Sequence, residues 1–281
     1  MRVYAFADEA SAFVAGQIAA MRRNGLNGLE IRNVEGTNVS DLSIAKAKEI
    51  RKRLEDAGLI VWSIGSPIGK IHISDDFPAH RERFLHTLEV AEAMNAENIR
   101  LFSFYPDAGM EKDAFRDAAF ERLNALIDAA KGAKAALCHE NEKGIYGDKA
   151  DRCAEIHAAF PSLRAVFDPA NFIQCGQETL SAWKMLKGYV KYLHIKDALA
   201  DGHVVPAGKG IGNVNAILSD FIAHGGKDVT IEPHLKVFDG LNALERDQQR
   251  SAVGGYLYET NDQAFDAACA ALRELLEGGK A

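Results

Sequence analysis

Four stretches of the sequence place a residue that can bind a metal ion at or near the end of an apolar run. Glu140 ends "AALCHE", Asp168 ends "LRAVFD", His194 lies in "VKYLHI" and Glu232 ends "VTIE". Three carboxylates and one imidazole suit Mn²⁺, Mg²⁺ or Co²⁺ better than an ion that prefers thiolates. Several ionised carboxylates in one buried site are costly unless they are paired or bound to metal. The residues therefore predict a site for a divalent cation, with a network of structural salt bridges as the alternative.

The segments that must position these residues alternate between short apolar runs and helical patterns. Such alternation indicates a parallel sheet, and the mostly apolar strands indicate that both of its faces are covered. Eight strand–helix units fit a (β/α)8 TIM barrel, whose active sites lie at the C-terminal ends of the strands. A doubly wound open sheet is the competing fold, but its glycine fingerprint does not follow the first strand. The predicted strands lie in residues 2–8, 26–32, 59–66, 97–105, 135–140, 163–169, 190–197 and 229–235.

The alternation runs without a linker, so residues 1–281 are predicted to form one barrel domain. Residues 236–260 are an insertion between the last strand and the last helix. It is expected to carry a short helix and to cover the barrel mouth or a partner surface, since structureless loops of this length are uncommon. A net charge of -7 argues against a general nucleic-acid binder. With no signal peptide, no membrane-spanning run and four scattered cysteines, the protein is predicted to be cytoplasmic and not bound to membranes.

Five stretches carry a resemblance to a known family. In this order, "LCHENEKGIYGD", "VFDPANF", "YLHIKD", "VVPAGKG" and "TIEPHL" resemble the xylose isomerase-like barrels that are grouped as sugar phosphate isomerases and epimerases. The resemblance covers nearly the whole chain. It implies that Glu140, Asp168, His194 and Glu232 hold one divalent cation, with Mn²⁺ favoured and Mg²⁺, Co²⁺ or Zn²⁺ as alternatives. It also implies a homo-oligomer, either a dimer or a tetramer.

The same resemblance to ketose 3-epimerases implies that Glu140 and Glu232 face each other across a carbohydrate substrate and exchange protons with it. Two carboxylates on opposite sides of a carbon next to a carbonyl can remove a proton from one face and return it to the other. A metal ion stabilises the enediolate that forms between these steps. The hypothesis is therefore a metal-dependent isomerase or epimerase for a keto-sugar or related polyol. The alternatives are a metal-dependent lyase (a dehydratase or 3-keto-glycoside deglycosidase) and a non-catalytic sugar-binding or accessory subunit.

Four residues are predicted to contact the substrate. Asn171 stands in "DPAN", where the related epimerases often have a histidine, and the missing histidine also argues against the related apurinic endonucleases. Lys196 shares strand parity with His194 and is predicted to reach substrate oxygens. Lys70 in "GSPIGK" is a second candidate, with a simple turn as the alternative. Lys209 in "AGKGIGN" could bind a phosphate ahead of a helix, although a glycine-rich loop also suits a tight turn.

Other polar residues near these stretches are expected to be structural. His139 should point away from the barrel interior, because neighbouring strand residues face opposite sides. Arg100 lies early in its strand and is expected to form a structural ion pair. His157 is expected to be an ordinary helix histidine, Glu142 a solvated loop charge, and Asp41 the cap of the second helix. Further charged residues end the first two strands and receive no assigned role: Asp8, Glu9, Glu30 and Arg32.

Overall fold

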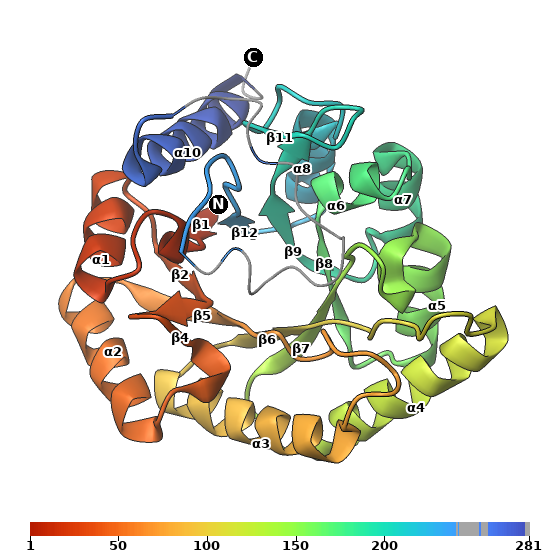
Figure 1. The fold of residues 1–281 in the computed structure, drawn as a ribbon. Helices are drawn as coiled ribbons and strands as arrows, with labels where there is room; N and C mark the ends of the chain where they lie inside the picture. The colour runs from red at the N-terminus through yellow and green to blue at the C-terminus, as the bar shows by residue number, and fades with distance from the viewer. Residues whose placement is uncertain (240, 242–252, 254–257, 279–281) are drawn as a thin grey trace.

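Eight parallel strands close into a barrel at the centre of the molecule (Figure 1). The computed structural model describes residues 1–239, 241, 253 and 258–278. The order round the barrel is β1-β12-β9-β8-β7-β6-β5-β2, so the predicted (β/α)8 barrel is confirmed. Each predicted strand segment overlaps one barrel strand. These strands are β1 (Arg2–Ala5), β2 (Gly28–Ile31), β5 (Ile60–Gly65), β6 (Asn98–Leu101), β7 (Ala136–Glu140), β8 (Arg164–Phe167), β9 (Val190–Ile195) and β12 (Asp228–Ile231).

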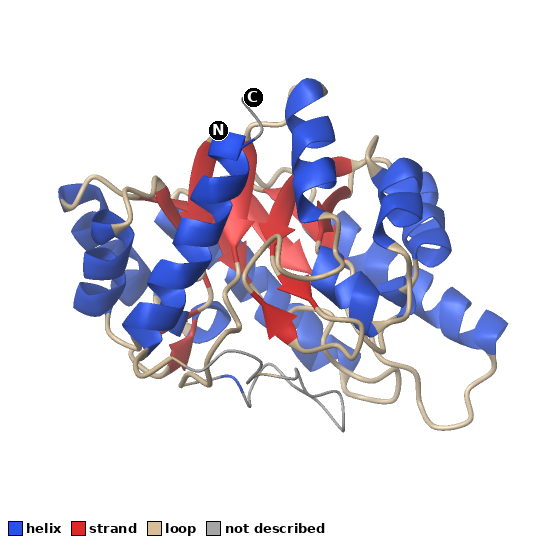
Figure 2. Ribbon diagram, turned by 90° about the horizontal axis from the view of Figure 1, so that it is seen from above, coloured by secondary structure: helices blue, strands red, loops and turns tan. Residues whose placement is uncertain are grey.

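Helices surround the barrel as an outer layer, with the strands inside (Figure 2). Their bounds are α1 (Val14–Arg23), α2 (Ile44–Asp56), α3 (Phe77–Met94), α4 (Lys112–Ala129), α5 (Ala150–Ala159), α7 (Thr179–Leu186), α8 (Val214–Ala223) and α10 (Asn261–Gly278). The prediction that Asp41 caps the second helix is wrong. The chain first makes the 3-10 turn η2 (Val39–Asp41), and Ser43 Oγ then accepts the capping hydrogen bond from Lys46 N. None of the described helices combines the length and apolar character needed to cross a membrane.

Short elements that the sequence pattern did not predict lie in the loops after the barrel strands. They are η1 (Ala7–Glu9), the hairpin β3 (Asn33–Val34) and β4 (Thr37–Asn38), η3 (Tyr146–Asp148), α6 (Pro169–Gln174), and the hairpin β10 (Asp197–Ala198) and β11 (Val204–Val205). Most of the predicted insertion at residues 236–260 lies outside the described residues, so its short helix stays a prediction. The single-domain organisation of residues 1–281 also stays a prediction.

Strand alternation divides the barrel interior into an apolar layer and a charged layer. A separate buried cluster contains Tyr4, Trp62, Cys138, Val166 and Tyr192. Glu140, Asp168 and His194 each follow a member of this cluster by two positions, on or just beyond the same strand. Because side chains two positions apart share one face of a strand, the interior changes from apolar to charged within one step toward the C-terminal rim. The fold thus places the predicted site above an apolar floor.

His139 and His157 meet between the barrel and its helices, with their ring centres 5.8 Å apart, which agrees with an outward-pointing His139 and with His157 as a helix histidine. His139 is buried, and its Nε2 lies 3.0 Å from Ser103 Oγ. The ring of His157 stacks on Tyr189, and its Nδ1 lies 3.1 Å from the carbonyl oxygen of Leu163. Burial lowers the pKa of His157 from 6.5 to about 4. The imidazole is therefore neutral in the folded protein at neutral pH.

We expect His157→Gln to reduce the acid sensitivity of the fold. Between pH of about 6.5 and 4, the unfolded chain binds a proton at this residue that the folded chain does not bind. The contribution of His157 to stability is complete above pH 6.5 and is lost as the pH falls through this window. The unfolding free energy of the variant should therefore fall less steeply than that of wild type in urea titrations across the window. His224→Gln, at an exposed position, is the control, and parallel profiles for wild type and His157→Gln would contradict the prediction.

Candidate metal centre

The four predicted metal ligands meet at the C-terminal rim of four adjacent strands. Glu140 ends β7, Asp168 directly follows β8, His194 lies in β9, and Glu232 directly follows β12. All four side chains are buried, and one ligand atom from each lies within 4.8 Å of the others. The strand order β12-β9-β8-β7 explains this meeting, because adjacent strands bring neighbouring rim positions together. The cluster is the one that the strand-end pattern predicted.

His194 stands at the centre of the cluster, and each of its ring nitrogens faces a carboxylate. Nδ1 lies 3.0 Å from Glu140 Oε1, 3.9 Å from Asp168 Oδ2 and 3.6 Å from Glu232 Oε2. Nε2 lies 3.1 Å from Glu30 Oε2. An outer carboxylate of this kind fixes the orientation and tautomer of a metal-binding histidine. Glu30 therefore has a role that sequence reasoning did not assign.

The charges around His194 favour a cation on this ring. Burial lowers the pKa of His194, but the carboxylates of Glu140 and Glu30 outweigh it and raise the pKa to about 10. Tyr192 donates a hydrogen bond of 2.8 Å to Glu30 Oε1 and holds that carboxylate in place. Since a proton and a metal ion are alternative occupants of Nδ1, the same surroundings that hold a proton there also suit a divalent cation.

The oxygen atoms of the cluster fit a metal ion as well. Glu140 Oε2 and Asp168 Oδ2 are buried and, among the described residues, accept no aligned hydrogen bond, although Arg100 Nη1 lies 3.1 Å from the first oxygen and Lys196 Nζ lies 2.8 Å from the second. Burial raises the pKa of Asp168 to about 6; Lys196 opposes this shift, while Glu232 and Glu140 add to it. Several carboxylates buried together need positive charge, and a divalent cation would add to the charge that Arg100 and Lys196 supply. The donor set of three carboxylates and one imidazole thus agrees with the predicted hard-metal site.

Lys196 enters the cluster itself. Its Nζ lies 2.8 Å from Asp168 Oδ2 and 2.8 Å from Glu232 Oε2. The strand alternation that predicted a shared direction for Lys196 and His194 is therefore confirmed. These carboxylates outweigh the effect of burial and raise the pKa of Lys196, so the ammonium group stays charged. Lys196 supplies one of the positive charges that the three acidic ligands require.

Asn171 also borders the cluster, from the helix that begins after β8. Asp168 caps this helix, since its Oδ1 accepts a hydrogen bond of 2.9 Å from Asn171 N. Asn171 Nδ2 donates to Glu140 Oε1 at 3.2 Å and to the carbonyl oxygen of Asn141 at 2.9 Å. Its Oδ1 is buried and has no hydrogen-bond partner in the described part of the chain. Asn171 therefore positions Glu140 and leaves one buried acceptor beside the site.

A second group of acids lies on the β1 side of the cluster. Ligand atoms of Glu9, Glu232 and His234 lie within 4.8 Å of one another. The guanidinium of Arg32 lies 3.1 Å from both Glu9 Oε1 and Glu232 Oε1 and forms a bidentate pair with Asp8. Because Arg32 balances these acids, we interpret this corner as an ion-pair network around an arginine.

Lys70 lies near the mouth of the barrel but outside the four-ligand cluster. Its Nζ donates to Glu142 Oε2 at 2.9 Å and lies 4.4 Å from the centre of the Phe102 ring. Lys143 Nζ lies 3.6 Å from Glu142 Oε1. The expectation that Glu142 is a solvated loop charge is wrong, because only 14% of its side chain is exposed and two lysines flank it. Arg100 forms the expected ion pair, at 3.1 Å from Glu140 Oε2.

Lys209 is exposed in the glycine-rich loop and does not join the other predicted site residues. The loop wraps around a carboxylate of its own chain. Backbone N–H groups of Gly208, Gly210 and Gly212 donate to the Asp197 carboxylate at 2.8–3.0 Å. A Cβ on Gly210 would collide with Asp197, so glycine is required for this close approach. These contacts favour the tight-turn interpretation over a phosphate site.

Comparisons with known proteins agree with this fold. The family described as xylose isomerase-like TIM barrel matches residues 18–249, and the chain belongs to this family. No curated protein matches the sequence. Several solved structures share the barrel at low sequence identity, and this likeness concerns the fold alone.

Three of these structures show the range of proteins that share the fold. The probable 3-DHS dehydratase AsbF from Bacillus anthracis has a TM-score of 0.74 and 15% identity, over 97% of this chain and 99% of that chain. The IolI protein with a bound zinc atom has a TM-score of 0.75 and 15% identity, over 99% of each chain. An L-ribulose 3-epimerase has a TM-score of 0.76 and 18% identity, over 99% of this chain and 95% of that chain. Epimerases and a dehydratase are thus among the structural neighbours.

Proposed function

We propose that the protein is a divalent-metal-dependent isomerase or epimerase that acts on a keto-sugar or related polyol through an enediolate. One observation carries the proposal: His194 Nδ1 faces three buried carboxylates while Glu30 holds Nε2. Glu140, Asp168, His194 and Glu232 would hold the ion. A divalent cation there would polarise the substrate carbonyl and stabilise the negative charge that develops on its oxygen.

Glu140 and Glu232 are the proposed acid–base pair. They come from β7 and β12, which flank β8 and β9 in the barrel, so their carboxylates approach the cluster from opposite sides. Burial opposes ionisation of Glu232, but Lys196, His234, His194 and Arg32 outweigh it and hold its pKa well below the usual range. Glu232 is therefore ionised, which is the protonation state that a general base requires. Two such groups can remove and return a proton on opposite faces of one carbon.

The remaining predicted features extend this proposal. The substrate is a small carbohydrate, the favoured ion is Mn²⁺, and the protein acts as a cytoplasmic homo-oligomer. Elimination from the same enediolate would make the protein a lyase, in line with the dehydratase among its structural neighbours. The mass of the product separates these outcomes, because isomerisation leaves it unchanged and elimination lowers it by the leaving group.

Metal content is the first test of the proposal. We expect about one divalent ion per chain in protein loaded with Mn²⁺, and its loss in His194→Ala and Asp168→Ala, because each variant removes a direct ligand. Exposed His224→Ala is the control and should retain the ion. Elemental analysis after gel filtration measures the content, and the melting temperature of each variant shows that it is folded. A folded wild type that binds no ion, or variants that bind as much as wild type, would remove the basis of the proposal.

A further inference from the structure

Two buried arginines at the barrel mouth differ in how well their N–H groups are satisfied. Arg32 uses all three guanidinium nitrogens, which donate to Asp8, Glu9 and Glu232 at 2.9–3.1 Å. A guanidinium carries five N–H donors in a rigid fork, and burial requires acceptors for them. Arg32 meets this requirement within the protein and is a structural residue. Arg100 does not meet it.

Among the described residues, Arg100 makes one side-chain hydrogen bond, a long contact of 3.4 Å from Nη2 to the carbonyl oxygen of Ser66. Its Nη1 lies 3.1 Å from Glu140 Oε2, but this oxygen accepts no aligned hydrogen bond. Its Nε has no acceptor within the described ranges of the chain, although only 4% of the Arg100 side chain is exposed. A buried guanidinium in this state is costly unless a ligand provides acceptors.

Aromatic rings hold the Arg100 guanidinium in position. Its Cζ lies 5.1 Å from the centre of the Phe6 ring and 4.9 Å from that of Phe102. Lys70 Nζ lies 4.4 Å from the same Phe102 ring. Two cations therefore share one aromatic side chain. Lys70 Nζ also lies 2.9 Å from Glu142 Oε2, and Lys143 Nζ lies 3.6 Å from the other oxygen of this carboxylate.

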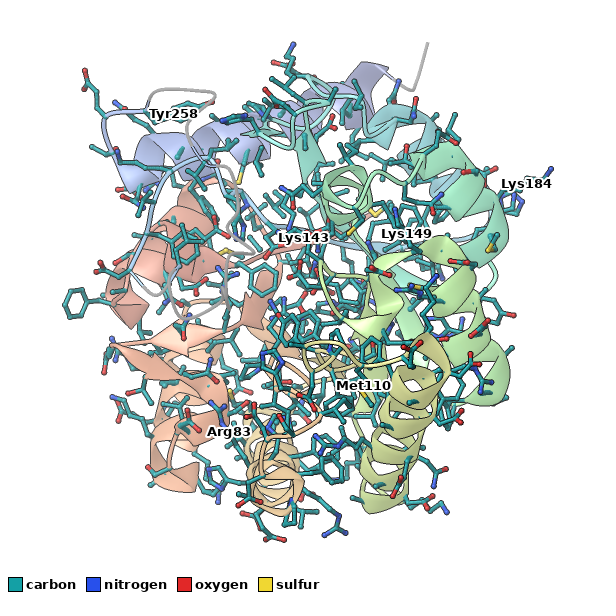
Figure 3. All side chains as sticks on the ribbon, turned by 45° about the vertical axis from the view of Figure 1, so that its right-hand side comes forward. Arg83, Met110, Lys143, Lys149, Lys184 and Tyr258 are labelled. Carbon is teal, nitrogen blue, oxygen red and sulfur yellow. The ribbon has the colours of Figure 1, made fainter. Side chains whose placement is uncertain are left out.

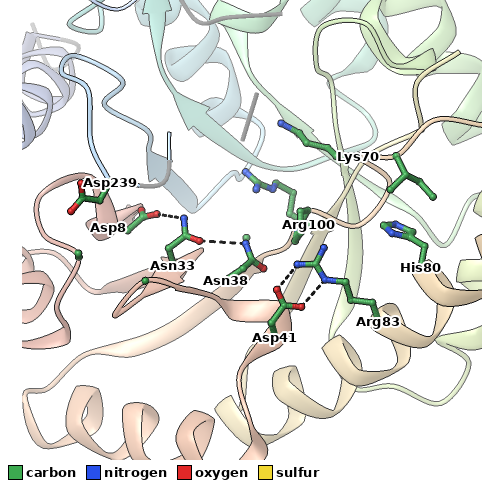
Figure 4. Close-up of a pocket in the computed structure, with 14 residues that line it drawn as sticks. Asp8, Asn33, Asn38, Asp41, Lys70, His80, Arg83, Arg100 and Asp239 are labelled. Carbon is green, nitrogen blue, oxygen red and sulfur yellow. Dashed lines mark hydrogen bonds and ion pairs between the residues drawn. The ribbon is translucent and has the colours of Figure 1, made fainter. Parts of the chain in front are cut away.

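Arg100 and Lys70 line a cavity of about 440 Å³ at the barrel mouth, within the size range of small-molecule sites (Figure 4). Figure 4 shows the two cations on the same side of this cavity, with Asp8 and Asp239 toward its other end. Asp41 also lines the cavity, but Arg83 holds its carboxylate in a bidentate pair. The Arg100 end of the cavity thus carries two cationic side chains and adjoins Glu140 of the four-ligand cluster.

We propose that the substrate carries an anionic oxygen group, a carboxylate or a phosphate, which Arg100 and Lys70 bind in this cavity. Because Arg100 Nη1 lies 3.1 Å from Glu140 Oε2, an anionic group bound at Arg100 lies next to the four-ligand cluster. The remainder of the substrate can then extend to that cluster. This inference names a substrate class for the proposed function and rests on that function. A carboxylate or phosphate would accept hydrogen bonds from the Arg100 guanidinium, and Lys70 would place a second positive charge beside it.

The test compares three four-carbon ligands that differ at one end: D-erythronate, erythritol 4-phosphate and uncharged erythritol. Isothermal titration with the full-length protein measures their affinities, with Mn²⁺ added and again after chelation. The chelated sample excludes direct binding of an acid to the metal ion. We expect at least one acid to bind about tenfold or more tightly than erythritol, and the stronger of the two acids identifies the group.

Substitutions locate the binding. Arg100→Gln and Lys70→Gln should each weaken the preferred acid about tenfold or more and leave erythritol unchanged. Arg100→Lys keeps the charge without the fork and should restore part of the affinity. Lys184→Gln is the control for net charge, because Lys184 is exposed at the edge of the molecule (Figure 3). Lys143, which contacts the same acid as Lys70, lies near the centre of that view. Melting temperatures establish that each variant is folded, and Lys70→Gln tests the proposal if Arg100→Gln does not fold.

Equal binding of all three ligands would overturn the inference, and so would an acid preference that survives in both Arg100→Gln and Lys70→Gln. These outcomes differ from a failure of the proposed function. Acid binding that requires Arg100 in a protein without bound metal or proton exchange would leave the anion site in place and remove the isomerase. Proton exchange on a neutral ketose, without any preference for an acid, would leave the proposed isomerase in place and remove the anion site.

Discussion

Glu140→Gln and Glu232→Gln are each expected to lower the rate of isomerisation or epimerisation about 10²- to 10⁴-fold, the range typical for loss of a general acid or base. Both carboxylates belong to the buried cluster, and they come from β7 and β12, the outer two of the four adjacent strands that form it. Glutamine preserves the size of each side chain but cannot accept the proton. Turnover of a ketose panel that includes L-ribulose and D-psicose measures the loss.

Exchange with deuterated water makes the test sharper than turnover alone. If one carboxylate serves each face of the substrate carbon, each single variant should still exchange the proton of one epimer and not of the other. Glu140→Gln and Glu232→Gln should then show opposite preferences, measured by NMR on each epimer separately. A single base that serves both faces predicts loss of all exchange in one variant and little effect in the other.

Glu92→Gln is the control for these variants. Glu92 lies on α3 in an exposed ion pair with Lys134, 3.3 Å apart, and belongs to neither the four-ligand cluster nor the Arg32 network. Its turnover should match wild type. Undiminished turnover of a true substrate by both Glu140→Gln and Glu232→Gln would show that the proposed acid–base pair is wrong.

The barrel could be predicted from sequence because its signal is local and repeated. A run such as "VKYLHI" is apolar along its length, and the helical pattern that follows it supplies the crossover to the next strand. The short elements at the rim lack such a signal. The two-residue hairpin strands β3 and β10 are too short for periodicity, and Asp41 was misread as a cap because an extra turn precedes α2.

The four ligands could be predicted because each stands at the end of a strand, where barrels carry their sites. Their partners could not be predicted in the same way. Arg32 on the loop after β2 meets Glu232, which lies 200 residues later, and this contact depends on closure of the barrel between β1 and β12. The sequence likewise gives no means to see that Asp197 fills the glycine-rich loop, because their contact depends on the fold of the hairpin between them.

These partners change the chemistry that the ligands alone would suggest. Lys196 contributes a positive charge between Asp168 and Glu232, and Glu30 holds the far side of His194. The cluster therefore combines fixed protein cations with four side chains that could hold a metal ion. The protein cations balance part of the negative charge of the carboxylates, so a bound ion would have to balance less of it. The same cations keep Glu232 ionised.

Arg32→Met is expected to destabilise the fold by about 3–5 kcal/mol, because removal of one partner leaves buried charge uncompensated. Arg32 pairs with three acids, and only 1% of its side chain is exposed. Arg83→Met is the matched control, since Arg83 forms a similarly close bidentate pair with Asp41 at 2.6–2.7 Å, but 36% and 48% of these side chains are exposed to solvent. Loss of an exposed pair costs about 0–1 kcal/mol.

Thermal unfolding separates the two variants. We expect a fall in melting temperature of roughly 10 °C for Arg32→Met and of no more than about 3 °C for Arg83→Met. Arg32 helps to hold the pKa of Glu9 and Glu232 below 4.5, so this part of its contribution is lost, and the Arg32→Met deficit shrinks, as the pH falls below 4.5. Equal losses in both variants, or a deficit independent of pH, would mean that buried charge does not determine the role of Arg32. The contrast with Arg100 would then lose its physical basis, since both arginines are buried and the argument requires that a buried guanidinium depend on its acceptors.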